Sequence, residues 1–165
     1  PQPIIAAVNG AAAGGGLALV LGSDVRIAAR SAKFNVAFIR VGYSACDIGT
    51  SWLLPRIVGV TRATDLLLSG RVFTGDETRD WGLWNGVAPD GVAALAMAQQ
   101  WAQSLATSAG PTAVATTKAQ IYRDLIRHDV GMSVDESIAL INDATQTAEY
   151  REGVSALRDK RPPQF

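Results

Sequence analysis

The feature that most constrains the fold of this chain is an apolar segment of strand length that runs into three consecutive glycines. Residues 3–8 are apolar at nearly every position, which is typical of a strand buried on both faces of a sheet. An Asn-Gly pair ends the strand, and the glycines at 14–16 open a second apolar segment, residues 17–21. The pattern predicts a buried strand, a glycine turn and a short helix in direct succession.

A helix that opens on glycines offers hydrogen-bond donors to a ligand. The N–H groups of the first helical turn have no carbonyl partner inside the helix, and the helix dipole adds partial positive charge there. The glycines at 14–16 would let a ligand oxygen approach these N–H groups closely. Taken alone, the turn is consistent either with a site for a developing oxyanion or with tight strand-to-helix packing without a ligand.

The glycine-rich segment fits neither a membrane span nor a nucleotide-binding loop. No charged residue occurs from Pro1 to Ser23, but glycines and prolines divide this stretch into elements shorter than the roughly 20 helical residues that cross a bilayer. We therefore expect no membrane span. The glycines do not fit the G-x-G-x-x-G dinucleotide pattern, and no Gly-Lys-Ser/Thr follows them as in a phosphate-binding loop.

The rest of the chain divides into an alternating half and a helical half. Strand and helix patterns alternate up to Asp90, after which the apolar residues recur at helical spacing. No linker rich in proline, serine or charge separates the halves, so residues 1–90 and 91–165 are expected to belong to one unit. Capping-box patterns at residues 74–77 and 133–136 predict helix starts. The other expected helices are residues 51–57, 63–68, 92–106, 111–126 and 151–158, and the other expected strands are residues 25–28, 33–36, 70–73 and 86–88.

Residues 3–10 followed by Ala13-Gly14-Gly15-Gly16 resemble the signature segment of the crotonase superfamily, the enoyl-CoA hydratase/isomerase family. The resemblance is colinear and implies the C-terminal two-thirds of a subunit with an α/β, crotonase-like (ClpP/crotonase) fold. Residues 1–90 would be the C-terminal part of a ββα spiral core, and residues 91–165 a helical region for trimerisation. The matching segments continue through residues 23–28, 33–34, 54–59, 66–70, 88–89 and 151–153.

The resemblance also implies a role for the glycine turn. The Gly15 N–H would be one of two donors that hold the thioester carbonyl of an acyl-CoA, and Ala13 and Gly14 would lie against the substrate. The segment that supplies the second donor in the family is not among the residues of this chain. Coenzyme A would enter as part of the substrate, and no separate cofactor is expected.

The chain departs from the family at the two positions that usually carry catalytic glutamates. The first position, two residues after the glycines, is Ala18, and the second, after the Lys33-Phe34 match, is Phe38. Neither side chain can transfer a proton, so hydration by the usual acid–base pair is not expected. Apolar side chains at these positions would line a drier and narrower substrate pocket.

Asp47 is the candidate for the missing acid or base. It lies in the loop of residues 42–50, which is similar to the G-x-x-x-D-x-G-T loop of the dienoyl-CoA isomerases of the family, although one residue longer. A single carboxylate can move a proton between carbons α and γ of an enoyl thioester, which favours isomerisation. The alternative is that Asp47 only caps the helix that follows.

The resemblance implies partners as well. Lys160 lies in the C-terminal tail, which in this family often reaches a coenzyme A site on a neighbouring subunit. The expected partners are an acyl-CoA substrate and copies of the same chain in a homotrimer or hexamer. The leading expectation is an enzyme of fatty acid metabolism, a lyase or isomerase, with isomerisation favoured over hydration. The alternative is a catalytically inactive crotonase-fold subunit that binds acyl-CoA or serves assembly.

Composition argues against several other functions. The net charge is zero and no run of basic residues occurs, so no nucleic-acid partner is expected. One cysteine and one histidine cannot assemble a zinc-type ligand cluster, so no metal site is expected. The single Cys46 suits a reducing, cytoplasmic location. A hydrolase acting through Ser44 or Cys46 is the weakest option, because no base lies nearby in sequence.

Overall fold

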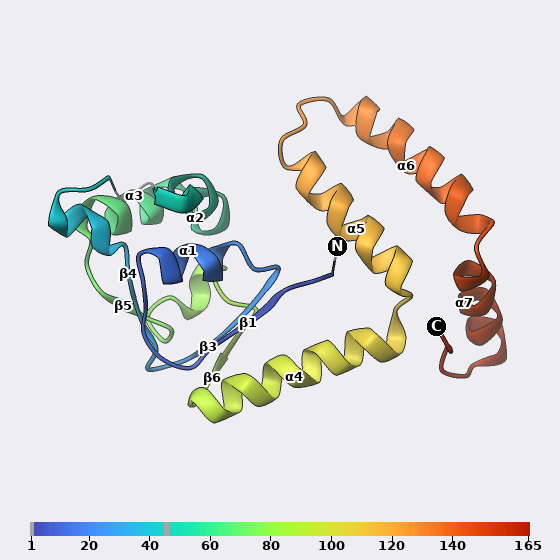
Figure 1. The fold of residues 1–165 in the computed structure, drawn as a ribbon, viewed down its shortest axis with the longest axis horizontal. Coiled ribbons are helices and arrows are strands. Elements are labelled where there is room, and N and C mark those ends of the chain that lie inside the picture. Colours follow the sequence, from blue (N-terminus) through green and yellow to red (C-terminus); the bar gives the residue numbers. More distant parts are fainter. Residues whose placement is uncertain (1, 45–46) are drawn as a thin grey trace. The chain divides into compact units, whose positions relative to one another are not determined.

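The computed structural model describes residues 2–44 and 47–165, with the backbone but not the side chain of Asp47. Cys46, the candidate thiol, lies outside the described residues. The chain forms two compact units, one running from Ile4 to Gln100 and the other made of Trp101–Phe165 with the first residues of the chain. We call them the sheet unit and the helical unit (Figure 1). The predicted division of roles between residues 1–90 and 91–165 stays a prediction.

Three parallel strands build the first sheet of the sheet unit. β1 (Ile5–Val8) pairs with β3 (Val25–Ala29), and β3 pairs with β6 (Gly86–Ala88). Parallel strands are usually covered on both faces, and Val25 and Ile27 of the central strand are accordingly buried. The strand predicted at residues 3–8 is confirmed, although it begins two residues later.

The second sheet lies one step further along the same repeat. β2 (Ala12–Ala13) pairs in parallel with β4 (Lys33–Asn35), which pairs antiparallel with β5 (Phe73–Thr74). α1 (Gly15–Leu21) follows β2, so β1, β2 and α1 form one strand–strand–helix unit. Because β3 pairs with β1 and β4 with β2, the next unit stacks on it, as the predicted ββα spiral requires.

The core of the sheet unit includes α1 and two further helices, α2 (Thr50–Val58) and α3 (Val60–Ser69). At its centre the ring of Phe34 stacks on Phe73 with centroids 5.5 Å apart and meets the ring of Trp84 at 4.6 Å. This packing fixes α1 and therefore the glycine turn that precedes it. The leucines buried around the rings are Leu17, Leu21, Leu54, Leu66 and Leu83.

The helix predicted to start at the capping box of residues 74–77 does not form. The N–H of Glu77 donates to Oγ1 of Thr74 at 3.1 Å, as such a box requires. A turn follows, however, and leads only to the short 3₁₀ helix η3 (Arg79–Trp81). The N–H groups of Gly75 and Asp76 donate to carbonyl oxygens of the loop after β3. These long-range hydrogen bonds hold the segment in a turn, so the prediction from local pattern is wrong.

Four helices make up the rest of the chain. α4 (Gly91–Ser108) starts in the sheet unit, where Ala94 and Ala98 pack on the side chains of the first sheet. The remaining helices belong to the helical unit and are α5 (Pro111–Asp124), α6 (Val130–Thr145) and α7 (Ala148–Asp159). Within residues 2–44 and 47–165 no helix is both long and apolar enough to cross a membrane.

α6 begins earlier than its sequence pattern indicates. The capping box predicted a start at Ser133, but the N-cap is Asp129, whose carboxylate accepts the N–H of Gly131 at 2.7 Å. The Ser133 hydroxyl instead donates to the carboxylate of Asp124 at the end of α5. Asp129 and Ser133 are both acceptable N-cap residues and lie four residues apart. The hydroxyl of Ser133 is engaged in the contact with α5.

Candidate active site

The glycine turn begins at Gly14, whose backbone conformation suits glycine. Gly14 has φ 52° and ψ −117°, and its N–H donates to the carbonyl oxygen of Asn35 in β4 at 3.1 Å. Its own carbonyl oxygen accepts the N–H of Ala18 at 3.0 Å, which starts the hydrogen bonding of α1. The turn is therefore held by the second sheet before it and by the helix after it.

Gly15 is the first residue of α1. N–H groups in a first helical turn find no carbonyl partner inside their own helix, so the Gly15 N–H lies where a ligand oxygen could accept it. Gly15 is half-buried, whereas Ala13 before the turn and Gly16 after it are exposed. This arrangement is compatible with the predicted donor role of Gly15 and with substrate contacts at Ala13 and Gly14, which stay predictions.

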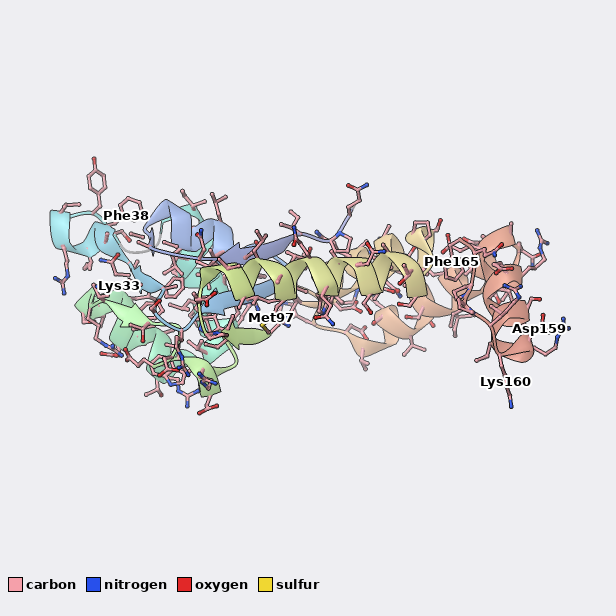
Figure 2. The ribbon with its side chains drawn as sticks, turned by 90° about the horizontal axis from the view of Figure 1, so that it is seen from below. Lys33, Phe38, Met97, Asp159, Lys160 and Phe165 are labelled. Carbon is pink, nitrogen blue, oxygen red and sulfur yellow. The ribbon has the colours of Figure 1, made fainter. Side chains whose placement is uncertain are left out.

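Ala18 and Phe38, at the positions of the expected glutamates, are apolar neighbours of the turn. Ala18 lies on the buried face of α1 with 4% of its surface exposed. Phe38 lies in the 3₁₀ helix η1 (Ala37–Val41) and is half-buried beside α1 (Figure 2). Its ring carbons Cε2 and Cζ come within 2.9 Å of the position that a Cβ of Gly14 would occupy. The ring covers the turn and offers no group that exchanges protons.

The loop that carries Asp47 approaches the start of α1. The short 3₁₀ helix η2 (Asp47–Gly49) contacts α1 and leads directly into α2. Cδ1 of Ile48 lies 3.4 Å from the position that a Cβ of Gly15 would take. Gly49 stands at the N-cap position of α2 and has no side chain that could cap the helix. The side chain of Asp47 lies outside the described residues, so its role as acid, base or cap stays a prediction.

Lys160 belongs to the helical unit. It ends α7 in the left-handed conformation with φ 52°, and its side chain is exposed (Figure 2). Beyond it the tail folds back, because Arg161 donates to both carboxylate oxygens of Glu152 at 2.7 and 3.0 Å and the Gln164 N–H donates to one of them. Arg161, assisted by Gln164, lowers the pKa of Glu152 to about 2. A contact of Lys160 with coenzyme A stays a prediction.

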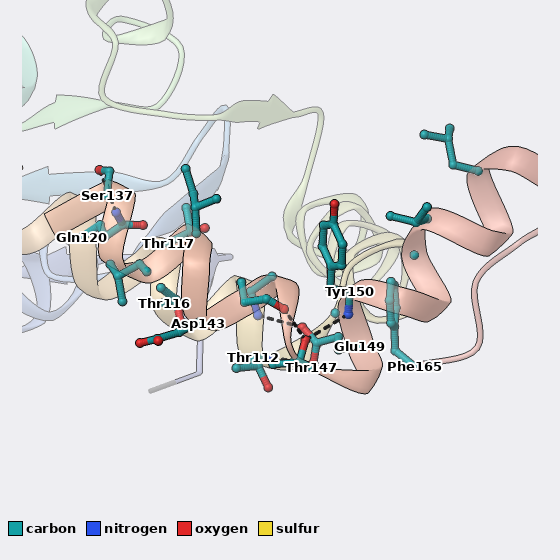
Figure 3. A pocket seen from close by; sticks show the side chains of 18 residues that line it. Thr112, Thr116, Thr117, Gln120, Ser137, Asp143, Thr147, Glu149, Tyr150 and Phe165 are labelled. Atoms are coloured by element: carbon teal, nitrogen blue, oxygen red, sulfur yellow. Dashed lines mark hydrogen bonds between the residues drawn. The ribbon is translucent and has the colours of Figure 1, made fainter. Parts of the chain in front are cut away.

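A cavity of about 750 Å³ lies within the helical unit, between α5, α6 and α7 (Figure 3). Its lining is mainly apolar, with Leu140, Ile141, Val154 and Phe165 among the residues that contribute. Sequence reasoning did not find this cavity. Its walls come from three helices and from the C-terminal residue, and no local pattern signals such a combination.

Glu149, at the edge of the cavity, joins α7 to the start of α5. Its carboxylate accepts the N–H groups of Thr112 at 3.1 Å and Ala113 at 2.9 Å. Burial alone would raise the pKa of Glu149, but the hydrogen bonds from Ala113 and Thr112 outweigh it and leave the pKa below its usual value. The sequence pattern missed this contact because the partners are far apart in the chain.

The structure describes the side chains of possible metal ligands over residues 2–44 and 48–165. In the part of the chain that the structure describes, no three or more His, Cys, Asp or Glu side chains lie where they could share a metal ion. His128, the single histidine of the sequence, is exposed in the connection between α5 and α6.

Comparisons with known proteins agree with one another. The chain matches the model of the family described as enoyl-CoA hydratase/isomerase over residues 1–165. It is 41% identical to 1,2-epoxyphenylacetyl-CoA isomerase of Escherichia coli, over 100% of this chain and 62% of that protein. It is 34% identical to a mevalonyl-coenzyme A hydratase of Beauveria bassiana, over 98% of this chain and 58% of that protein.

A solved structure with the same fold is enoyl-CoA hydratase from Bacillus anthracis. It is 33% identical in sequence, gives a TM-score of 0.92, and is matched over 100% of this chain and 62% of its own length. The chain therefore spans somewhat less than two thirds of the length of the relatives it matches.

Proposed function

Because the chain belongs to the enoyl-CoA hydratase/isomerase family, we propose that it binds enoyl-CoA thioesters and moves a proton along the acyl chain rather than adding water. One observation carries the proposal: the glycine turn is intact, while the two positions beside it that would hold an acid–base pair are Ala18 and Phe38. A carbonyl can be polarised at this turn, but no pair of carboxylates is present at those two positions to activate a water.

The thioester carbonyl oxygen accepts a hydrogen bond from the Gly15 N–H in this mechanism. Loss of a proton from carbon α or γ places negative charge on that oxygen, so the hydrogen bond strengthens as the enolate forms. A donor of this kind typically changes kcat by about 10²- to 10³-fold. The helix dipole of α1 adds partial positive charge at the same end.

Asp47 acts as both base and acid in this proposal. Its carboxylate takes the proton from one carbon and returns it to the other, so a single group completes the isomerisation. What supports the assignment is that η2, which begins at Asp47, contacts α1. The ring of Phe38 over Gly14 limits water beside the enolate, which favours return of the proton over hydration.

The helical unit is proposed to assemble a homotrimer or hexamer. No residue of α5 or α6 is buried, and large apolar side chains on both helices are exposed. Helices of this kind gain stability when their apolar faces are covered. A second copy of the chain would supply that cover.

A subunit that binds acyl-CoA without catalysis is the second candidate. The observation that favours it is the same loss of both glutamate positions, to Ala18 and Phe38. Binding energy from the glycine turn would remain in such a subunit, but no proton would move. The two candidates differ in whether Asp47 matters for turnover.

The deciding experiment offers the intact protein a short 2-enoyl-CoA and its 3-enoyl isomer and follows double-bond migration and water addition separately. We expect migration without hydration. Asp47→Asn should lower kcat for migration by about 10²- to 10⁴-fold, because a positioned acid–base group contributes an effect of that size. Coenzyme A binding, measured by calorimetry, should persist in the variant.

Asp80→Asn serves as the matched control, because Asp80 is an exposed aspartate in η3. It should leave migration unchanged. Hydration that survives Asp47→Asn would contradict the proposed mechanism. Tight coenzyme A binding by the wild type with no turnover of either isomer would favour the subunit without catalysis.

A further inference from the structure

We propose that Ile48 determines which acyl groups the site accepts, by packing its side chain against the acyl carbons next to the thioester carbonyl. The inference rests on the function proposed for the turn at Gly15. It goes beyond that function because it assigns substrate selection to one residue outside the proton-transfer chemistry.

Ile48 has an unusual backbone conformation. It has φ 51° and ψ 34°, in the left-handed region that β-branched residues rarely enter. Among the described residues Lys160 is the other non-glycine with positive φ, and it lies at a helix end, where this conformation is common. Glycine would adopt the angles of Ile48 without strain. A strained residue kept in a loop beside a ligand site is typical of a functional constraint.

The side chain of Ile48 points toward the glycine turn. Its Cδ1 is in van der Waals contact range of Gly15, at 3.4 Å from the position of a Cβ there. At the same time 61% of the residue surface is exposed. A side chain whose tip approaches Gly15 while most of the residue is exposed still has apolar surface that a bound acyl chain could cover.

Phe38 provides a neighbouring apolar contact. The ring of Phe38 packs on Gly14, and the tip of the Ile48 side chain approaches Gly15. Each of these two adjacent glycines therefore has one apolar side chain next to it. An acyl group whose carbonyl oxygen reaches the Gly15 N–H would lie against this surface. A methyl branch on carbon α would then compete with the Ile48 side chain for space.

The test compares the wild type, Ile48→Val and Ile48→Gly in the intact protein, with but-2-enoyl-CoA and 2-methylbut-2-enoyl-CoA as substrates. Ile48→Gly should raise the ratio of kcat/KM for the branched over the straight substrate by about tenfold or more, the usual size for one methyl group in an apolar pocket. Ile48→Val should lie between. The melting temperature should not fall in Ile48→Gly, because glycine fits the backbone.

Each other outcome has a distinct meaning. If Ile48→Gly lowers the melting temperature and both kcat/KM values while their ratio stays constant, Ile48 is only a packing residue and the inference is wrong, although the proposed function stands. If the wild type turns over neither substrate, the proposed function fails. In that case the ratio of the Kd values for the two thioesters, measured by calorimetry, decides the inference. A change of this ratio in Ile48→Gly would support the role of Ile48 in substrate selection. An unchanged ratio, or no binding of either thioester, would overturn it.

Discussion

Single backbone positions decide what the glycine turn can do. Gly14 adopts a positive φ and lies under the ring of Phe38, so this position cannot hold a side chain without displacement of that ring. Ile48 adopts a positive φ although it is not glycine, and its tip reaches Gly15. The two residues share a positive φ but differ in ψ, which is −117° at Gly14 and 34° at Ile48. At Gly14 the conformation makes room for the Phe38 ring, and at Ile48 it positions an apolar side chain.

Gly14→Ala is expected to destabilise the protein by about 1–3 kcal/mol, because the backbone would be strained and the new Cβ would meet the Phe38 ring at 2.9 Å. Gly10→Ala is the control, since no atom lies within 4 Å of a Cβ added there. It should change the free energy of unfolding by less than about 0.5 kcal/mol. Urea unfolding of both variants measures the difference, and equal effects would show that the turn tolerates a side chain.

Helices in the helical unit are joined by side chains from distant positions. The N-cap residue of α5 is Gly110, which has no side chain, and Glu149 of α7 accepts the first N–H groups of α5 in its place. A Cβ at Gly110 would collide with that carboxylate. The sequence of α5 alone therefore leaves its start uncapped, and the missing acceptor comes from another helix.

Glu149→Gln is expected to cost about 0.5–2 kcal/mol at pH 7, the usual range for loss of an N-terminal cap. Because the folded-state pKa of Glu149 lies below its ordinary value of 4.5, the charged form contributes stability above pH 4.5. That contribution is lost as pH falls below 4.5 through the lowered pKa. The difference between wild type and variant in urea unfolding should therefore shrink in acid.

Asp135→Asn, which removes a carboxylate at an exposed position of α6, is the control for Glu149→Gln and should leave the free energy of unfolding at pH 7 unchanged. A difference between wild type and Glu149→Gln that stays constant from pH 7 to pH 3 would mean that charge plays no part in the cap.

The two units of the protein differ in how far their side chains are buried. The sheet unit encloses a core of aromatic and aliphatic side chains, whereas α5 and α6 have no buried residue. Burial of apolar surface is worth roughly 25 cal/mol per Å², so the exposed faces of these helices favour association. Such association is what the proposed homotrimer or hexamer requires.

Ile138→Asp tests the assembly, because Ile138 lies in α6 and is 54% exposed. The wild type should have the mass of a trimer or hexamer by light scattering after gel filtration, and the variant should shift toward the monomer. Asn142→Asp adds the same charge at an exposed polar position of the same helix and should keep the mass of the wild type. A wild type that is monomeric, or a variant of unchanged mass, would refute this surface as an interface.

Much of the fold follows from local pattern. The strands around residues 5–8, 25–29 and 86–88 and the helices from Gly91 onward were predicted because apolar periodicity and glycine punctuation are local properties of the chain. The family was predicted from the order of short motifs and is shown by the match over residues 1–165. The assignment of Ala18 and Phe38 to the positions that usually carry catalytic glutamates came from the same resemblance and stays a prediction.

Other properties depend on contacts between distant residues. The segment after Thr74 stays a turn because its N–H groups bond to the loop after β3, which no capping pattern reveals. Phe38 and Ile48 lie on neighbouring glycines of the turn although more than 20 residues separate each from it, and Glu149 reaches the start of α5 across 36 residues or more. The local sequence determines which segments form strands, turns and helices. Which side chain contacts a particular N–H group or carbon depends on the tertiary structure, because apolar surfaces from distant parts of the chain pack together to exclude water.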